Sequence, residues 1–120
     1  MEGITIRPVQ GSDRADWMRL WSSYLRFYEA SLAEEVYETT WNRLFEPGEF
    51  EPRCLLALVE ARPAGLVHYL FHRSCWSIEG NCYLQDLYVD EDARGTRLGQ
   101  ALIEAVQREA ATRGVTNVYW

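Results

Sequence analysis

A short turn in the second half of the chain carries residue types that bind anions. Residues 94–100 read Arg-Gly-Thr-Arg-Leu-Gly-Gln and lead into an apolar pattern that predicts a helix. The first turn of a helix leaves backbone N–H groups without partners, and no Ser, Asp or Asn directly precedes Leu98 to cap them. The two glycines permit a sharp turn and close approach of a ligand, while the two arginines add charge at the positive end of the helix dipole. This combination favours a phosphate or pyrophosphate; the alternative is that the glycines only serve the turn and the arginines are only solvated.

The histidines and cysteines give weaker signals. His68 and His72 lie four residues apart on an expected strand, and therefore on one face, but no third ligand stands at a suitable spacing, so a metal site is not expected. Cys54, Cys75 and Cys82 are odd in number and show no CxxC spacing. We therefore expect buried free thiols rather than a disulfide or zinc framework.

The elements that must position these residues follow from local patterns. Alternating apolar residues predict strands, and apolar residues at helical spacing predict helices. The expected order is a strand at 3–9, a helix from Ser12 or Asp13 to 32, a helix at 34–45, strands at 54–61, 65–73 and 81–89, a helix at 98–113 ended by Gly114, and a strand at 115–120. Strands 54–61 and 65–73 form a hairpin whose turn is expected at residues 61–65. The last helix presents an apolar stripe that must pack on the sheet.

Composition limits the kind of protein. With 120 residues, 48% hydrophobic and 13% aromatic, the chain suits one globular domain spanning residues 1–120. A formal charge of -6 disfavours nucleic acid and anionic membrane surfaces and favours cationic small molecules. No apolar run approaches the ~20 residues of a membrane span, and the first residues do not resemble a signal peptide. We therefore expect a cytoplasmic protein without nucleic-acid or membrane partners.

Residues 82–105, "CYLQDLYVDEDARGTRLGQALIEA", resemble the acyl-CoA-binding motif of the GNAT N-acetyltransferase superfamily. In that family a strand ending in a pattern like LxxLYV leads to an Arg/Gln-x-x-Gly-x-Gly/Ala loop that opens a helix. The loop here has Arg97 where the family has its middle glycine; a positive φ would strain this residue, whereas a helical φ would let its side chain reach a phosphate. The resemblance, which the element order supports, implies an α/β fold with a mixed, mostly antiparallel central sheet flanked by helices, lacking the family's last helix and two strands.

The same resemblance implies acetyl-CoA as co-substrate and no metal. The main chain of the strand end would bind the pantetheine arm, and the backbone N–H groups of the loop would bind the pyrophosphate. The implied cofactor-binding residues are Leu87, Tyr88, Val89, Arg94, Gly95, Thr96, Arg97, Leu98, Gly99 and Gln100. Arg94 occupies the family's usual basic position and is expected to contribute more than Arg97.

Two further stretches, "LQDLYV" and "RFYEAS", resemble the polyamine and thialysine acetyltransferase branch, which implies direct acetyl transfer to the primary amine of a small molecule. Gln85 stands at the position of that branch's candidate Glu base; its amide can orient a substrate or a water but cannot accept a proton as a base. Asp86 is the candidate catalytic or amine-steering carboxylate, with a structural role at a strand irregularity as the alternative. Tyr28 and Glu29 are candidates for an amine pocket, although the neighbouring aromatic residues indicate core.

Members of the family normally continue into a further helix and two strands that carry a tyrosine acid. This chain stops at Trp120, so the acid is not assigned; either the sequence is a fragment or a partner supplies that wall. An open apolar edge at residues 118–120 would invite pairing with a second copy, and we expect a homodimer through this strand. The competing functions are a non-catalytic acyl-CoA-binding or interaction module, and a domain that binds another phosphate ligand at the same loop.

Overall fold

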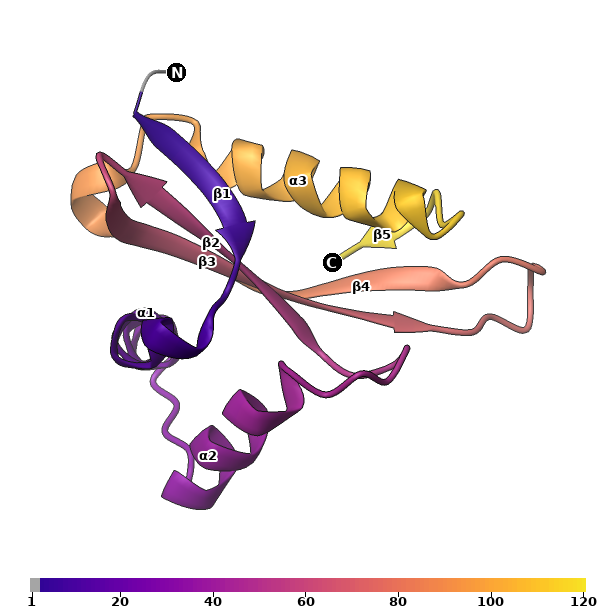
Figure 1. Cartoon of the computed structure of the whole chain (residues 1–120), viewed down its shortest axis with the longest axis horizontal. Coiled ribbons are helices and arrows are strands. Elements are labelled where there is room, and N and C mark those ends of the chain that lie inside the picture. Colours follow the sequence, from indigo (N-terminus) through magenta and orange to yellow (C-terminus); the bar gives the residue numbers. More distant parts are fainter. Residues whose placement is uncertain (1–2) are drawn as a thin grey trace.

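The computed structural model describes residues 3–120, in which a five-stranded sheet separates one helix from two others (Figure 1). The elements are β1 (Ile4–Pro8), η1 (Gly11–Asp13), α1 (Arg14–Phe27), α2 (Glu34–Arg43), β2 (Arg53–Val59), β3 (Arg62–His72), β4 (Asn81–Val89), η2 (Glu91–Ala93), α3 (Leu98–Thr112) and β5 (Val118–Tyr119). The strands lie in sequence order, β1 to β4 are antiparallel, and β5 runs parallel to β4. This confirms the expected fold class and element order.

A separate apolar core lies on each face of the sheet. On one face α3 buries its predicted stripe, with Leu98, Leu102 and Val106 at most 1% exposed. On the other face α1 and α2 pack three buried tryptophans, Trp17, Trp21 and Trp41, against the strands. Strands β2 and β3 are buried along most of their length because both of their faces are covered. Within residues 3–120 no helix is both long enough and apolar enough to cross a membrane.

A β-bulge in β4 turns one polar residue toward the tryptophan core. Asp86 lies opposite His68 while Leu84 lies opposite Tyr69, which leaves Gln85 as the extra residue. Because the bulge adds one residue to β4, Leu84 before it and Leu87 after it lie on the same face of the sheet. Both side chains pack in the α3 core. Asp86 therefore faces the α1 side, and Gln85 is exposed.

Strand β4 has a free edge over most of its length. Its parallel partner β5 pairs only with Cys82 and Tyr83, near the β3–β4 hairpin (Figure 1). From Leu84 to Val89 no described strand pairs with this edge. Backbone groups along it are therefore available to an extended ligand.

The β2–β3 hairpin differs from the expected one. Its turn consists of Glu60 and Ala61, both with positive φ, rather than residues 61–65. Pro63 and Gly65 lie within β3, opposite Leu58 and Ala57, at a register shift between those two residues. A proline is tolerated there because the irregularity relieves it of a ladder hydrogen bond.

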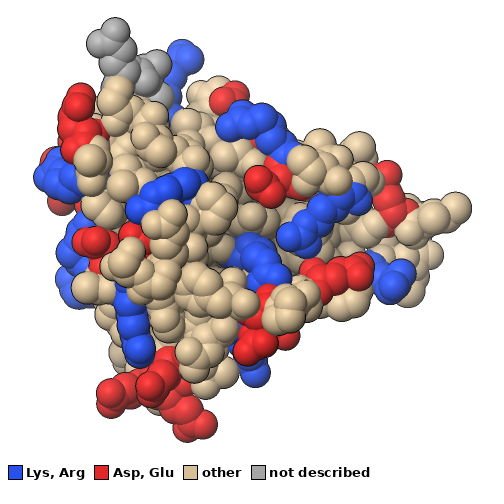
Figure 2. Space-filling model, viewed as in Figure 1, with Lys and Arg blue, Asp and Glu red and all other residues tan. Residues whose placement is uncertain are grey.

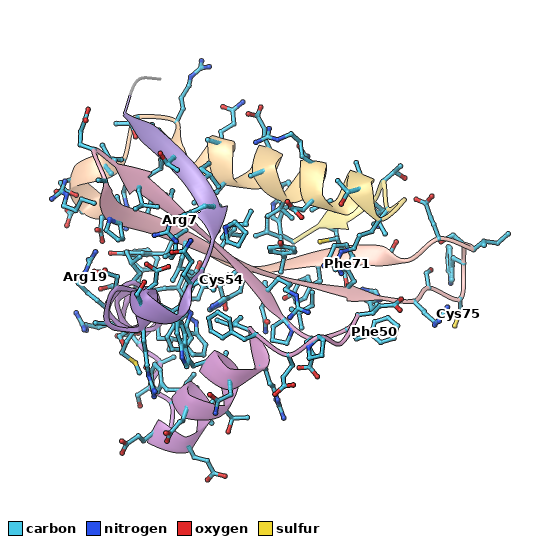
Figure 3. All side chains as sticks on the ribbon, viewed as in Figure 1. Arg7, Arg19, Phe50, Cys54, Phe71 and Cys75 are labelled. Carbon is cyan, nitrogen blue, oxygen red and sulfur yellow. The ribbon has the colours of Figure 1, made fainter. Side chains whose placement is uncertain are left out.

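The expected burial of Cys75 and the expected end of the first helix were both wrong. Cys75 is exposed, because it lies at the tip of the β3–β4 hairpin, whereas Cys54 and Cys82 are buried as expected (Figure 3). The first helix ends at Phe27 rather than near residue 32, and the side chains of Phe27 and Tyr28 are exposed. Helical spacing alone does not distinguish a core aromatic residue from one past the end of the covered face.

Candidate active site

The turn before α3 encloses a hollow with unbonded backbone donors. This loop hollow has a volume of about 390 Å³ and is lined by Val89, Ala93, Arg94, Gly95, Arg97, Leu98 and Gly99. In the described chain the backbone N–H groups of residues 95–100 donate no hydrogen bond; the first is from Ala101 N to Arg97 O, at 3.0 Å. Such a row of donors at a helix N-terminus binds anions. The structure thus brings most of the predicted loop residues together around one space, whereas Thr96 and Gln100 do not line it.

Arg97 adopts the strained alternative of the two considered from sequence. It is the N-cap of α3 with φ 65° and ψ 18°, in the left-handed region, and its side chain caps nothing. A residue with a Cβ is disfavoured there by roughly 1–2 kcal/mol, which glycine avoids. The loop therefore keeps the backbone geometry of a glycine at this position while carrying an arginine.

We expect Arg97→Gly to raise the free energy of unfolding, by up to ~1 kcal/mol, because it relieves the left-handed strain and loses only the backbone restriction of the unfolded chain. Arg97→Ala is the matched control, since it also removes the side chain but keeps a Cβ at the positive φ. Urea denaturation of both variants measures the difference. An Arg97→Gly variant no more stable than Arg97→Ala would contradict the strain.

Arg94 is held against the end of β4. Its Nε donates to Val89 O at 3.0 Å, and its guanidinium lies 5.8 Å from the centre of the Tyr88 ring. The Val89 carbonyl is therefore engaged, while the remaining guanidinium N–H groups carry no described bond. The Thr96 hydroxyl donates to Ala93 O at 2.5 Å and steadies the turn.

A second hollow lies along the free edge of β4. This edge pocket has a volume of about 280 Å³ and is lined by Tyr24, Tyr28, Leu84, Gln85, Leu87, Ile103 and Trp120. It brings together Tyr28 and Gln85, which were selected from sequence. Glu29 is exposed and does not line it. Tyr24 was not selected from sequence, although its position one helical turn before Tyr28 was a signal that the two share a face.

Asp86 is the end of a buried hydrogen-bonded chain. His68 Nδ1 lies 2.8 Å from Asp86 Oδ2, and Trp17 Nε1 donates to His68 Nε2 at 2.9 Å. His68 is only 3% exposed. Nothing in the sequence indicated this pairing, because it is made across β3 and β4 rather than along the sequence.

The hydroxyl of Tyr24 adjoins the same carboxylate. Burial first, and then the charge and hydrogen bonding of Asp86, hold the pKa of Tyr24 well above its usual value. Tyr24 is thus a neutral O–H donor at working pH. Asp86 itself does not line the edge pocket, but Tyr24 does, and Tyr24 therefore connects Asp86 with that space.

Charges elsewhere on the surface are mixed. Figure 2 shows arginines interspersed with acidic side chains, and a red cluster over α2, whose first turn carries Glu34 and Glu35. Arg19 on α1, labelled in Figure 3, pairs with Asp90 at 3.2 Å, which ties the helix to the end of β4. The described residues contain no group of three potential metal ligands.

Comparisons with known proteins agree on one family. The model of the acetyltransferase (GNAT) family matches residues 16–120. The D-amino-acid N-acetyltransferase HPA3 of Saccharomyces cerevisiae is 35% identical over 118 residues, covering 98% of this chain and 73% of the relative.

Solved structures give the same fold at lower identity. The aminoglycoside acetyltransferase meta-AAC0020 from an uncultured soil metagenomic sample superposes with a TM-score of 0.78 at 19% identity, covering 98% of this chain and 76% of that one. The integron cassette protein HFX_CASS3 from the mobile metagenome of Cole Harbour Salt Marsh gives a TM-score of 0.85 at 19% identity, covering 94% and 74%.

Proposed function

Since the chain belongs to the GNAT family of acetyltransferases and is an acyl-CoA-dependent N-acetyltransferase that acts on an amine, we propose that it transfers acetyl from acetyl-CoA to the primary amine of a small molecule. The observation that carries this proposal is the continuity of two features. The free edge of β4 leads directly into the loop hollow with its unbonded N–H groups. An extended ligand that ends in a pyrophosphate matches both.

The donor side can be assigned residue by residue. Backbone N–H groups of Gly95 to Gln100 would hold the pyrophosphate, and the free edge at Leu87 to Val89 would hold the pantetheine arm. Arg94 would place positive charge beside the phosphates. Acetyl-CoA supplies an acetyl thioester, which this arrangement would direct toward the edge pocket.

The acceptor side is proposed around Asp86. An ammonium ion must lose a proton before its nitrogen can attack a thioester, and a nearby carboxylate can attract the cation and accept the proton. Gln85 would orient the amine or a water through its amide, and Tyr28 would offer an aromatic face to the cation. Glu29 lies outside the edge pocket, so we assign it only long-range attraction of the ammonium ion.

Thiol release from acetyl-CoA in the presence of different amines tests the proposal. The panel contains D-amino acids, which the name of the yeast relative suggests, together with L-amino acids and diamines. We expect amine-dependent thiol release and an acetylated amine for at least one class. All 12 basic side chains are arginines, so self-acetylation of lysine adds no background. CoA binding without turnover of any amine would favour a non-catalytic acyl-CoA-binding module, and no CoA binding would reject the donor site.

We expect Arg94→Ala to weaken binding of free CoA about ten-fold or more, because a charge-assisted phosphate contact contributes ~1.5–3 kcal/mol. Arg97→Ala should cost less, since Arg97 occupies a position whose backbone, rather than side chain, shapes the loop. Calorimetric titration measures both. Because Arg94 also bonds Val89 O, a thermal melt of each variant checks that the loop is intact. A loss confined to Arg97→Ala would contradict the assignment.

A further inference from the structure

Two buried side chains are connected to Asp86 by hydrogen bonds but do not line the edge pocket. Trp17 is fully buried on α1, and His68 is 3% exposed on β3. Together with Asp86 they form one continuous chain of hydrogen bonds, of 2.9 Å and 2.8 Å. The chain begins in the tryptophan core and ends at the only carboxylate proposed to meet the amine.

The hydrogen bonds fix the tautomer of the imidazole. An indole N–H can donate but cannot accept, so the Nε2 atom of His68 must be the acceptor of the Trp17 bond. The imidazole proton then resides on Nδ1 and is donated to Asp86 Oδ2. Adding a second proton at Nε2 would set two N–H groups against each other in a buried site. The indole thus occupies the position at which a second proton would bind.

A neutral imidazole leaves the negative charge of Asp86 uncompensated. The N–H of His68 fixes one carboxylate oxygen without cancelling its negative charge, whereas an imidazolium or an arginine would compensate that charge. Among the described ion pairs and hydrogen bonds, Asp86 has no arginine partner. Its full charge is therefore available to an ammonium ion.

The other titratable groups packed around His68 do not compensate the negative charge of Asp86. Cys54 on β2 stands opposite His68, and burial raises the pKa of its thiol far above the usual range, so the thiol stays neutral. Tyr24 on α1 stays protonated for the reasons given above. Tyr37 on α2 packs in the same core. Asp13, before α1, pairs with Arg7 at 2.7 Å.

We propose that Trp17 and His68 are positioning residues for the transfer reaction: the indole sets the tautomer of the imidazole, and the imidazole N–H aims Asp86 at the amine while leaving its charge uncompensated. This rests on the proposed role of Asp86 in binding or deprotonating the amine. Both residues act through Asp86 and touch no reacting atom.

The chain offers a matched pair of variants for the test. Trp17→Phe removes the indole donor. Trp21→Phe removes the same atoms from the same helix and core, where the Trp21 ring lies 5.1 Å from the His68 ring but its Nε1 has no described partner. Both variants lose packing contacts, but only Trp17→Phe loses the hydrogen bond to His68.

In Trp17→Phe the Nε2 atom is free, so a second proton can enter as pH falls, and the resulting imidazolium neutralises Asp86. We therefore expect the KM for the amine, relative to the parent, to rise about ten-fold between about pH 8 and about pH 6, the range in which imidazoles titrate. The affinity for CoA should change little with pH relative to the parent, and kcat should fall together with the rise in KM only if Asp86 also accepts the proton of the amine. Trp21→Phe should keep the parent's pH profile even if it is less stable.

A conservative substitution at His68 provides a second, independent part of this test. His68→Asn keeps an N–H donor near Asp86 but cannot become a cation. The double variant Trp17→Phe/His68→Asn should therefore lose the new pH dependence, while His68→Leu, which has no donor, should lower kcat/KM at every pH. Equal pH profiles for Trp17→Phe and Trp21→Phe, or a pH dependence that survives in the double variant, would overturn the proposal.

Nitrogen NMR of the imidazoles separates this proposal from the proposed function, because it needs no turnover. We expect His68 to carry its proton on Nδ1 and to remain neutral across this pH range in the parent and in Trp21→Phe, and to gain a second proton in Trp17→Phe. The exposed His72 serves as an internal reference. If the NMR result holds but Asp86→Asn keeps full activity, the role of Asp86 fails rather than the tautomer; a His68 that titrates in the parent overturns the inference itself.

Discussion

Gly99→Glu is expected to abolish binding of CoA while leaving the fold intact. Gly99 lines the loop hollow in the first turn of α3, among the backbone donors proposed to hold the pyrophosphate. Two like charges about 4 Å apart repel by about 4 kcal/mol at an effective dielectric constant of 20, which corresponds to roughly a thousand-fold in affinity. A carboxylate near a helix N-terminus favours the helix, so the folded state should not suffer.

Two controls separate charge from size at this position. A Cβ at Gly99 would meet Val89 Cγ2 at 3.8 Å, which is ordinary contact, so Gly99→Ala should bind CoA nearly as the parent does. Gly99→Gln has the shape of the Glu variant without its charge, and the difference between the two in calorimetric titration isolates the repulsion. A Glu variant that binds CoA as well as the parent would remove this loop from the site.

The loop was predictable because its information is local. Seven consecutive residues, 94–100, carry the glycines, the arginines and the start of the helix, and their geometry depends on the residues next to them. What sequence could not settle was the φ of Arg97, where two backbone conformations were open. The choice depends on how α3 packs on the sheet, which is a tertiary effect.

The surroundings of Asp86 were not predictable in the same way. Its contact with His68 spans 18 residues, and that of His68 with Trp17 spans 51. The pairing also requires the bulge at Gln85, whose position depends on the register of β3 against β4. The spacing of titratable residues along the chain does not reveal a partner on a neighbouring strand.

The C-terminal strand shows how packing modifies a sequence pattern. Tyr119 stacks on Tyr83 with ring centres 5.1 Å apart, and its hydroxyl lies 2.6 Å from His72 Nε2. Trp120 contributes to the edge pocket. Tyr119 and Trp120, which the sequence indicated as part of an open apolar edge, thus make contacts within the chain. Pairing with a second copy through this strand stays a prediction, as does the cytoplasmic location.

Asp86→Asn is expected to lower kcat/KM for amines by roughly 10²–10⁴-fold, the usual contribution of a positioned acid or base, while the affinity for CoA stays nearly unchanged. Asparagine has the size of aspartate, and its amide oxygen can still accept from His68 Nδ1, so the hydrogen-bonded chain can persist. What the variant loses is the negative charge and the ability to take a proton. Steady-state kinetics with the best amine of the panel, together with calorimetric titration of CoA, measure the two effects separately.

The matched control is Asp90→Asn, just beyond the same strand. Asp90 loses an exposed ion pair with Arg19, but unlike Asp86 it does not adjoin Tyr24 of the edge pocket, so turnover should stay near that of the parent. The alternative role of Asp86, an acceptor that only holds the bulge, predicts a different pattern, because a structural acceptor affects folding and activity together. A parallel fall of melting temperature and turnover in Asp86→Asn would support that alternative, and a normal melting temperature with normal turnover would exclude both. Only a selective loss of amine turnover, with stability and CoA binding retained, matches a carboxylate that acts on the substrate.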